Sequence, residues 1–285
     1  MSNLYPKNTV QVPTFNTYRE SDAGKPLVLD VRNLGIDFGG LTAVDSFSVS
    51  LGPTEICGLI GPNGAGKTTI FNLLTGVYQP TRGSVLINGI DTKGMSTFKV
   101  TKLGIARTFQ NIRLFTDMSV LDNVKVGMHN QIKCSFVSSL FHLPSYFAAE
   151  KKANARAMEL LDFMGLADLA DQKAGSLPYG VQRRLEIVRA LATDPSIILL
   201  DEPAAGMNPS ETTELMHQIR RIRDTFHIAI FLIEHDMNLV MNVCEAIAVV
   251  NYGRLIAKGT PEEIRANPAV IEAYLGKEDS ADAEN

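Results

Sequence analysis

The feature that most constrains this chain is a glycine-rich stretch of eight residues, Gly61-Pro62-Asn63-Gly64-Ala65-Gly66-Lys67-Thr68. An apolar run precedes it at 55–60, and a segment with the composition of a short helix follows it at 68–76. Glycines allow successive backbone N–H groups to face inward, and such a nest binds phosphate oxygens. The positive end of the following helix acts on the same anion. The pattern of Gly, four residues, Gly, Lys and Ser or Thr therefore predicts a phosphate-binding loop between a strand and a helix.

The last two residues of this stretch, and Thr69 directly after it, have side chains with distinct expected roles. Lys67 is expected to reach the β- and γ-phosphates of ATP, the Thr68 hydroxyl to bind Mg²⁺, and Thr69 to complete the phosphate site. The alternative is a tight turn that merely exposes a lysine. A chance match to the whole pattern in a chain of this length has odds of about one in a hundred, and the flanking strand and helix provide the required context. The sequence therefore favours a nucleotide site.

An acidic pair, Asp201 and Glu202, follows the continuous apolar run 197–200. Such a run is typical of a strand that is buried on both faces of a parallel sheet. Ligands of open α/β sheets bind beyond the carboxyl ends of the strands. We expect Asp201 to bind Mg²⁺, directly or through water, and Glu202 to orient and deprotonate the attacking water. The alternative, two acids that simply open a loop, is disfavoured by the phosphate loop upstream.

Composition restricts the partners and the compartment. The net charge is −4, so the chain lacks the basic field of a nucleic-acid-binding protein, and we expect no nucleic-acid partner. Cys57, Cys134 and Cys244 are scattered, which favours a reducing cytosol over a disulfide framework or a zinc site. No apolar run approaches the roughly 18 residues that span a bilayer, and the polar N-terminus lacks a secretory signal. The sequence predicts a cytosolic protein that contacts a membrane only through a partner.

Sequence patterns divide the chain into several regions. Residues 1–25 show no sustained period and contain two prolines, which predicts a flexible extension. Alternating apolar residues over 27–60, broken by Gly-Gly and Gly-Pro, predict antiparallel strands joined by turns. Residues 116–193 have helical spacing and predict a helical subdomain, inserted into an α/β domain that covers 26–275. The acidic segment 276–285 predicts a disordered tail.

These motifs, taken in order, resemble those of the nucleotide-binding subunits of ABC transporters, from Leu27 to Gly276. The resemblance implies a P-loop NTPase fold with an antiparallel β subdomain and an inserted helical subdomain. It implies that Gln110, in RTFQN, senses Mg²⁺ and touches the membrane partner, and that His235, in IEHDM, contacts the γ-phosphate. Phe38, in DFGG, stands where the family carries an aromatic residue that stacks on adenine.

The signature segment of the family, Leu-Ser-Gly-Gly-Gln, is altered here to Leu177-Pro178-Tyr179-Gly180-Val181. In the family, the serine hydroxyl binds the γ-phosphate of the ATP that the opposite subunit holds. Pro178 has neither a hydroxyl nor a backbone N–H. Leu177 and Gly180 are kept, and the helix N-terminus at Gly180 still favours an anion. The resemblance therefore implies that two subunits sandwich ATP through a weakened contact.

Further segments resemble one branch of the family, the LivG-like ATPases of bacterial branched-chain amino-acid importers. They include FGGLTAV, ARTFQNIRLFTDMSVLDNV, LDEPAAGMNP and GTPEEIRANPAVIEAYLG, and the region 127–150 also fits this branch. The resemblance implies an ATP-hydrolysing, energy-coupling subunit that is peripheral to the cytoplasmic face of the inner membrane. The implied partners are a second ABC ATPase, two transmembrane permeases and, indirectly, a periplasmic substrate-binding protein.

Three alternatives remain open from the sequence. The cargo could be urea, amides or lipopolysaccharide, because nothing in this chain is expected to contact it. A degenerate nucleotide-binding partner with weak hydrolysis is favoured by the altered signature and opposed by Glu202 and His235. A soluble ABC ATPase acting on DNA or ribosomes usually carries coiled-coil insertions or tandem cassettes, and the sequence has neither.

Overall fold

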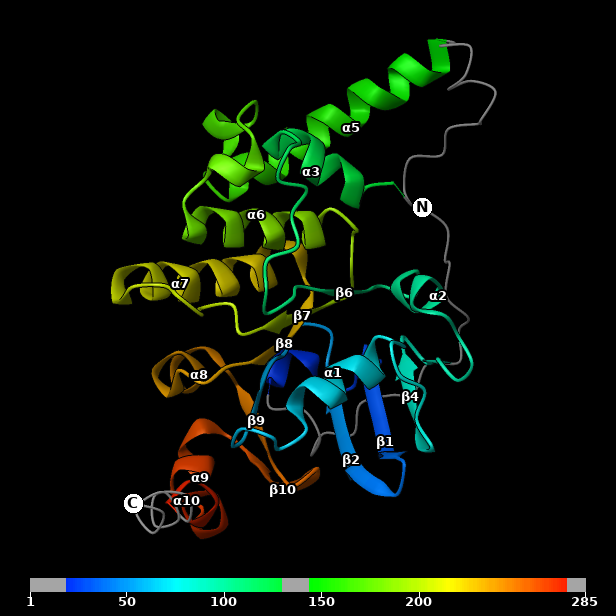
Figure 1. Ribbon diagram of the computed structural model, residues 1–285, viewed down its shortest axis with the longest axis vertical. Coiled ribbons are helices and arrows are strands. Elements are labelled where there is room, and N and C mark those ends of the chain that lie inside the picture. Colours follow the sequence, from blue (N-terminus) through cyan, green and yellow to red (C-terminus); the bar gives the residue numbers. More distant parts are fainter. Residues whose placement is uncertain (1–18, 130–143, 276–285) are drawn as a thin grey trace.

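The computed structural model describes residues 19–129 and 144–275 (Figure 1). Its centre is a six-stranded sheet in the order β10-β9-β3-β8-β7-β6. The five strands from β9 to β6 run parallel, and β10 pairs antiparallel with β9 at the edge. The strands span Ile56–Ile60 (β3), Ile105–Arg107 (β6), Ile197–Asp201 (β7), Ala229–Ile233 (β8), Ala246–Asn251 (β9) and Arg254–Gly259 (β10). This sheet, with helices packed on it, confirms the predicted α/β fold class.

A second, antiparallel sheet lies beside the first, in the order β2-β1-β4-β5. Its strands are Leu29–Phe38 (β1), Leu41–Leu51 (β2), Arg82–Ile87 (β4) and Ile90–Asp91 (β5). The predicted antiparallel pairing of 27–51 is therefore present. The same prediction for 55–60 is wrong, because β3 pairs parallel with β8 and β9. All five residues of β3 are buried, which is the environment of a central parallel strand.

The helices lie on both sides of the parallel sheet. Between β6 and β7, the described residues include three α-helices in the region that the sequence predicted to be helical: Val120–Gly127 (α3), Pro144–Phe163 (α5) and Tyr179–Leu191 (α6). In Figure 1 they form the green upper part of the molecule, above the yellow helix α7. The other helices are Lys67–Leu74 (α1), Thr97–Thr101 (α2), Pro209–Phe226 (α7), Met237–Val243 (α8), Pro261–Arg265 (α9) and Pro268–Leu275 (α10).

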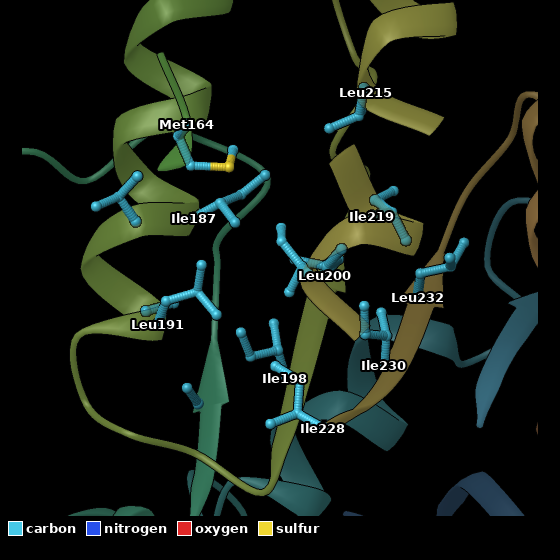
Figure 2. Close-up of a cluster of buried hydrophobic side chains, with 14 of the residues drawn as sticks. Met164, Ile187, Leu191, Ile198, Leu200, Leu215, Ile219, Ile228, Ile230 and Leu232 are labelled. Atoms are coloured by element: carbon cyan, nitrogen blue, oxygen red, sulfur yellow. The ribbon is translucent and has the colours of Figure 1, made fainter. Parts of the chain in front are cut away.

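The apolar core has two parts, one on each face of the parallel sheet. Alternate residues of β7 enter different parts, as the two-residue period of a strand requires. Ile198 and Leu200 face the helices (Figure 2), where they pack near Ile187 of α6 and Ile219 of α7. Leu199 lies in the other part, with α1 and the antiparallel sheet. Burying each such side chain stabilises the fold by about 1.5–3 kcal/mol, so this core holds the ends of the parallel strands in place.

Part of the predicted flexible extension packs on the domain. The Asp22 side chain is fully buried and accepts hydrogen bonds from the backbone N–H of Thr54 at 2.6 Å and from its hydroxyl at 2.8 Å. The rest of that extension, 1–18, and the predicted acidic tail lie outside the described residues. So does 130–143, within the region 127–150 that fits the importer branch. Among the helices of the described part, none is both long enough and apolar enough to cross a bilayer.

Candidate active site

The glycine-rich stretch connects the buried end of β3 to α1, in the position that the sequence predicted. A side chain at Gly61 would place its Cβ atom 2.1 Å from the carbonyl oxygen of Val250, at the end of the neighbouring strand β9. Gly66 is the N-cap of α1 and has a left-handed φ of 98°. Only glycine satisfies both requirements without strain. The loop is therefore shaped by its contact with β9 as well as by its own sequence.

Lys67 closes the loop onto its own beginning. Its ammonium group is buried and donates hydrogen bonds to the carbonyl oxygens of Gly61 at 2.6 Å and Pro62 at 3.1 Å. A lysine ammonium has three donors and a charge that suits phosphate. The positive charge of Lys67 therefore lies against the backbone at the beginning of the same loop.

A cavity of about 590 Å³ opens over this loop. Its walls include the predicted loop residues from Asn63 to Thr69, the beginning of β2, and three side chains from the opposite side. These are Gln110, Glu202 and His235. The cavity therefore collects, from four separate segments, most of the side chains that the sequence assigned to nucleotide binding and catalysis.

Glu202 connects the two other predicted residues opposite the loop. Its Oε2 accepts a hydrogen bond of 2.8 Å from Nε2 of Gln110, and its Oε1 lies 3.0 Å from Nε2 of His235. Glu202 has a φ of 48°, in the left-handed region that non-glycine residues rarely adopt. Its backbone N–H donates to the carbonyl oxygen of Ile233, which holds it in this conformation. Strained residues of this kind are enriched at functional sites.

The neighbouring Glu234 supports the segment that carries His235. Its buried carboxylate accepts hydrogen bonds from the backbone N–H groups of Ala204 at 2.7 Å and His235 at 3.1 Å. Burial raises the pKa of Glu234, and these hydrogen bonds oppose that effect. Because the two partners belong to the segments that follow β7 and β8, this side chain links those segments.

Asp201 is buried behind the cavity and forms an ion pair. Its Oδ2 lies 2.7 Å from Nη2 of Arg107, and both side chains are almost completely buried. Nη1 of the same arginine donates to Oδ1 of Asn72 in α1, also at 2.7 Å. Arg107 could not be recognised as a site residue from the sequence, where its signal is a single cation at the end of a short apolar run. Arg107 therefore links Asp201, the candidate metal ligand at the end of β7, to α1, the helix that follows the phosphate loop.

The residues proposed for the metal have suitable chemistry. Mg²⁺ is usually bound by one or two protein oxygens together with phosphate oxygens of the substrate and water. Thr68, Gln110 and Asp201 contribute a hydroxyl, an amide and a carboxylate to this region. Oδ2 of Asp201 is paired with Arg107, so Oδ1 would be the oxygen that binds the metal ion or its water. The donor set therefore fits Mg²⁺ held between protein and nucleotide.

Six predicted site residues do not line this cavity: Phe38, Gly61, Pro62, Leu177, Gly180 and Asp201. Gly61, Pro62 and Asp201 belong to the phosphate loop and the acidic strand end, whereas the other three are separate from both. Phe38 is 42% exposed and contacts the edge of the Tyr78 ring, with 5.2 Å between ring centroids. Leu177 is buried at the beginning of α6. Gly180, in the first turn of α6, lies against Glu211 of α7, because an added Cβ would meet that carboxylate at 3.1 Å. The structure therefore separates the signature segment from the phosphate loop of the same chain.

Two exposed apolar residues that the sequence analysis missed do line the cavity. Leu41, at the start of β2, is 72% exposed, and Tyr252, in the turn between β9 and β10, is 81% exposed. That turn is bound to the phosphate loop, since the N–H of Gly253 donates to the carbonyl oxygen of Ala65 at 3.0 Å. Nothing in the local sequence of a strand turn indicates that it will reach a loop nearly two hundred residues away.

A phosphate loop at the end of a parallel strand, facing across a cavity an acidic residue that directly follows another strand, is the arrangement of P-loop nucleotide-binding proteins. The ABC transporter family profile matches residues 44–205, and the profile of the branched-chain amino acid ATP-binding cassette transporter matches residues 254–280. The chain therefore belongs to the ABC transporter family, in the group of branched-chain amino acid transport ATP-binding proteins. It is an ABC transporter ATPase.

Individual relatives support this assignment. The chain is 48% identical to the high-affinity branched-chain amino acid transport ATP-binding protein LivG of Escherichia coli K12, over 88% of this chain and 98% of that protein. It is 45% identical, with the same coverage, to BraF of Pseudomonas aeruginosa, which has the same description. The crystal structure of the ADP conformation of MJ1267, an ATP-binding cassette of an ABC transporter, superposes with a TM-score of 0.76 at 31% identity, covering 88% of this chain and 99% of that one.

Proposed function

We propose that this chain is the energy-coupling subunit of a bacterial importer for branched-chain amino acids, driven by hydrolysis of ATP with Mg²⁺. The observation that carries the catalytic part is the placement of Glu202, between Gln110 and His235, across a single cavity from the phosphate loop. The identity to LivG and BraF supports the cargo.

Each residue of the cavity has a role in this proposal. The backbone of 61–69 and Lys67 bind the triphosphate, while Thr68, Gln110 and Asp201 would hold Mg²⁺, which would balance the phosphate charge. Glu202 accepts the proton of a water whose oxygen bonds to the γ-phosphorus as the bond to the bridging oxygen breaks. His235 orients that carboxylate and contacts the γ-phosphate. Phe38 and the exposed Leu41 and Tyr252 provide apolar surface near the cavity for the nucleoside.

The partners follow from the family and from the position of the signature segment. Leu177 and Gly180 lie outside the cavity of their own chain, which supports a contact with ATP held by a second ABC ATPase, identical or related. We propose two transmembrane permeases as the membrane partners, with Gln110 near their contact, and a periplasmic substrate-binding protein that acts indirectly. The chain would then lie at the cytoplasmic face of the inner membrane.

The decisive experiment is Glu202→Gln, which keeps the size and one acceptor oxygen of the side chain but removes the base. We expect ATP binding to remain and steady-state hydrolysis to fall by about 10²-fold or more, the range that a general base contributes. Glu159→Gln, at an exposed position of α5, is the matched control and should hydrolyse ATP as the unaltered chain does. Full hydrolysis by the Glu202 variant would exclude it as the base.

The same assay tests a nucleotide-binding partner with weak hydrolysis. That alternative is favoured by Pro178, the N-cap residue of α6, which has no side chain able to bind a phosphate or cap the helix. It predicts that the unaltered chain binds ATP but turns it over no faster than the Glu202 variant, both alone and with its permeases. Stimulation of hydrolysis by the membrane complex would instead support the energy-coupling role.

A further inference from the structure

Arg183, in the second turn of α6, is one of the largest fully buried side chains of the described residues. Its guanidinium group donates to the carbonyl oxygens of three residues that belong to, or adjoin, the candidate catalytic cluster. Nη1 donates to Phe109, and Nη2 donates to Gln110 at 2.6 Å and to Glu202 at 3.4 Å. One side chain of the helix that begins at the signature segment therefore contacts the backbone of both residues that form the 2.8 Å contact in the cavity.

Glu186, one turn further along α6, completes this arrangement. Its Oε2 accepts from Nη1 of Arg183 at 3.0 Å, and its Oε1 accepts from the backbone N–H groups of Phe109 at 3.3 Å and Arg113 at 3.4 Å. Both charged side chains are essentially inaccessible to solvent. Together they bind the C=O and N–H groups of the segment 109–113, so the contact depends on the backbone of that segment and not on its side chains.

The cost of this pair indicates that stability is not its main contribution. Two charges removed from water are compensated only when geometry and additional hydrogen bonds are favourable, and apolar replacements are often equally stable. Here Nε of Arg183 is buried, and no atom of residues 19–129 or 144–275 accepts a hydrogen bond from it. A buried pair that is incompletely satisfied and that contacts active-site backbone is a candidate for a functional role.

We propose that Arg183 is a positioning residue for ATP hydrolysis. It holds the backbone of Gln110 and Glu202 at a fixed separation, and it ties both to the first turns of α6. Displacement of a reacting group by about 1 Å can cost 10²-fold in rate, and a rotation of α6 that moves this guanidinium would act directly on the base. The signature helix and the catalytic carboxylate are thereby coupled within one chain. This inference rests on the proposed role of Glu202.

The test compares two neighbouring arginines of α6. Arg183→Lys retains the charge beside Glu186, but an ammonium on a flexible chain cannot reproduce the planar fork that contacts three carbonyl groups. Arg184→Lys is the matched control, because that side chain is partly exposed and pairs with the exposed Glu214 at 3.2 Å. We measure kcat, the KM for ATP and the melting temperature of the full chain, with Mg²⁺ present.

For Arg183→Lys we expect kcat to fall by about tenfold or more, with KM for ATP and the melting temperature close to those of Arg184→Lys. A residue that only balances the charge of Glu186 would be rescued by lysine, so an unchanged kcat would overturn the proposal. The double variant Arg183→Met with Glu186→Met removes both charges and should remain folded. It should lose kcat to the same extent.

Two further results would also overturn the inference. If both altered chains failed to fold while Arg184→Lys folded normally, the role of Arg183 would be structural. If kcat and KM changed together, the guanidinium would be acting on nucleotide binding. Neither result concerns Glu202, whose role is tested independently by Glu202→Gln. If the Arg183 variants lost kcat while the Glu202 variant hydrolysed ATP normally, Glu202 would not be the base. The claim that Arg183 acts by positioning Glu202 would then be overturned.

Discussion

The ion pair between Arg107 and Asp201 provides the sharpest prediction about stability. Arg107→Met keeps a long, flexible side chain that can still pack near the rings of Phe71 and Phe109, which the guanidinium now covers at 5.5 and 5.3 Å. It removes the partner of Asp201, whose side chain is only 4% exposed. A carboxylate that is left buried without its cation is the main consequence of this substitution.

The magnitude follows from burial. Removing one member of a buried ion pair costs about 3–5 kcal/mol in free energy of unfolding. For a chain of this size, about 2 °C of melting temperature corresponds to 1 kcal/mol, so we expect a decrease of about 6–10 °C. Arg82→Met is the control, because that arginine pairs with Asp37 at 2.9 Å but is 48% exposed. An exposed pair contributes about 0–1 kcal/mol, or at most about 2 °C.

The assay is thermal unfolding followed by circular dichroism, without nucleotide or Mg²⁺. Adding Asp201→Asn to Arg107→Met should recover part of the lost stability, because the uncompensated charge is then removed. The reasoning is refuted if Arg107→Met lowers the melting temperature no more than Arg82→Met. It is equally refuted if Asp201→Asn destabilises the Arg107 variant further, since the loss would then come from packing rather than from charge.

Two other predictions concern the phosphate loop and a buried thiol. Gly61→Ala should reduce affinity for a fluorescent ATP analogue by at least about tenfold, because its Cβ would lie 2.1 Å from the carbonyl oxygen of Val250 and such overpacking costs about 1–3 kcal/mol. The Cβ of Gly64→Ala would meet no atom of the described residues within 4 Å, so this substitution adds only the strain of a left-handed φ of 80°, about 1–2 kcal/mol, and should have the smaller effect. Equal losses of affinity in the two titrations would contradict this view of the loop. Burial raises the pKa of the Cys57 thiol to about 12. The folded state therefore keeps a proton that the unfolded state releases above about pH 9. The free energy of unfolding should fall by about 1.4 kcal/mol per pH unit as the pH rises from there toward 12. In urea unfolding at pH 9 to 11, Cys57→Ala should show a shallower decrease than the unaltered chain, and parallel slopes would refute the assignment.

The sequence predicted those parts of the site that lie in continuous segments. The phosphate loop was identified because its glycines, lysine and threonine follow one another within eight residues, between a strand and a helix. Asp201 and Glu202 were identified because a buried parallel strand is apolar throughout and its end is marked by the first charged residue. Gln110 and His235 required the family resemblance, since a single polar residue in a loop has no distinctive local pattern.

The contacts that unite the site could not be predicted from the sequence. Arg107 and Asp201 are 94 residues apart, and Arg183 is 73 residues from Gln110. Such pairs depend on strand order: β6 pairs with β7, which places 107–110 beside 201–202 and beneath α6. Strand order also explains why the prediction for 55–60 is wrong. The pattern of alternating apolar residues that begins at 27 predicted an antiparallel partner for this segment as well. The partner of β3 depends on segments that come much later in the chain.

Local chemistry along the chain predicted a phosphate loop, an acidic strand end and an α/β fold with a helical insertion, because each depends on residues that are close in sequence. The ion pair at Asp201, the clamp formed by Arg183 and Glu186, and the contact of Glu202 with Gln110 and His235 arise from long-range packing. They exist because the parallel sheet brings distant strand ends to one edge. Hydrogen bonds and ion pairs form only over a few ångströms, so these contacts depend on that tertiary arrangement.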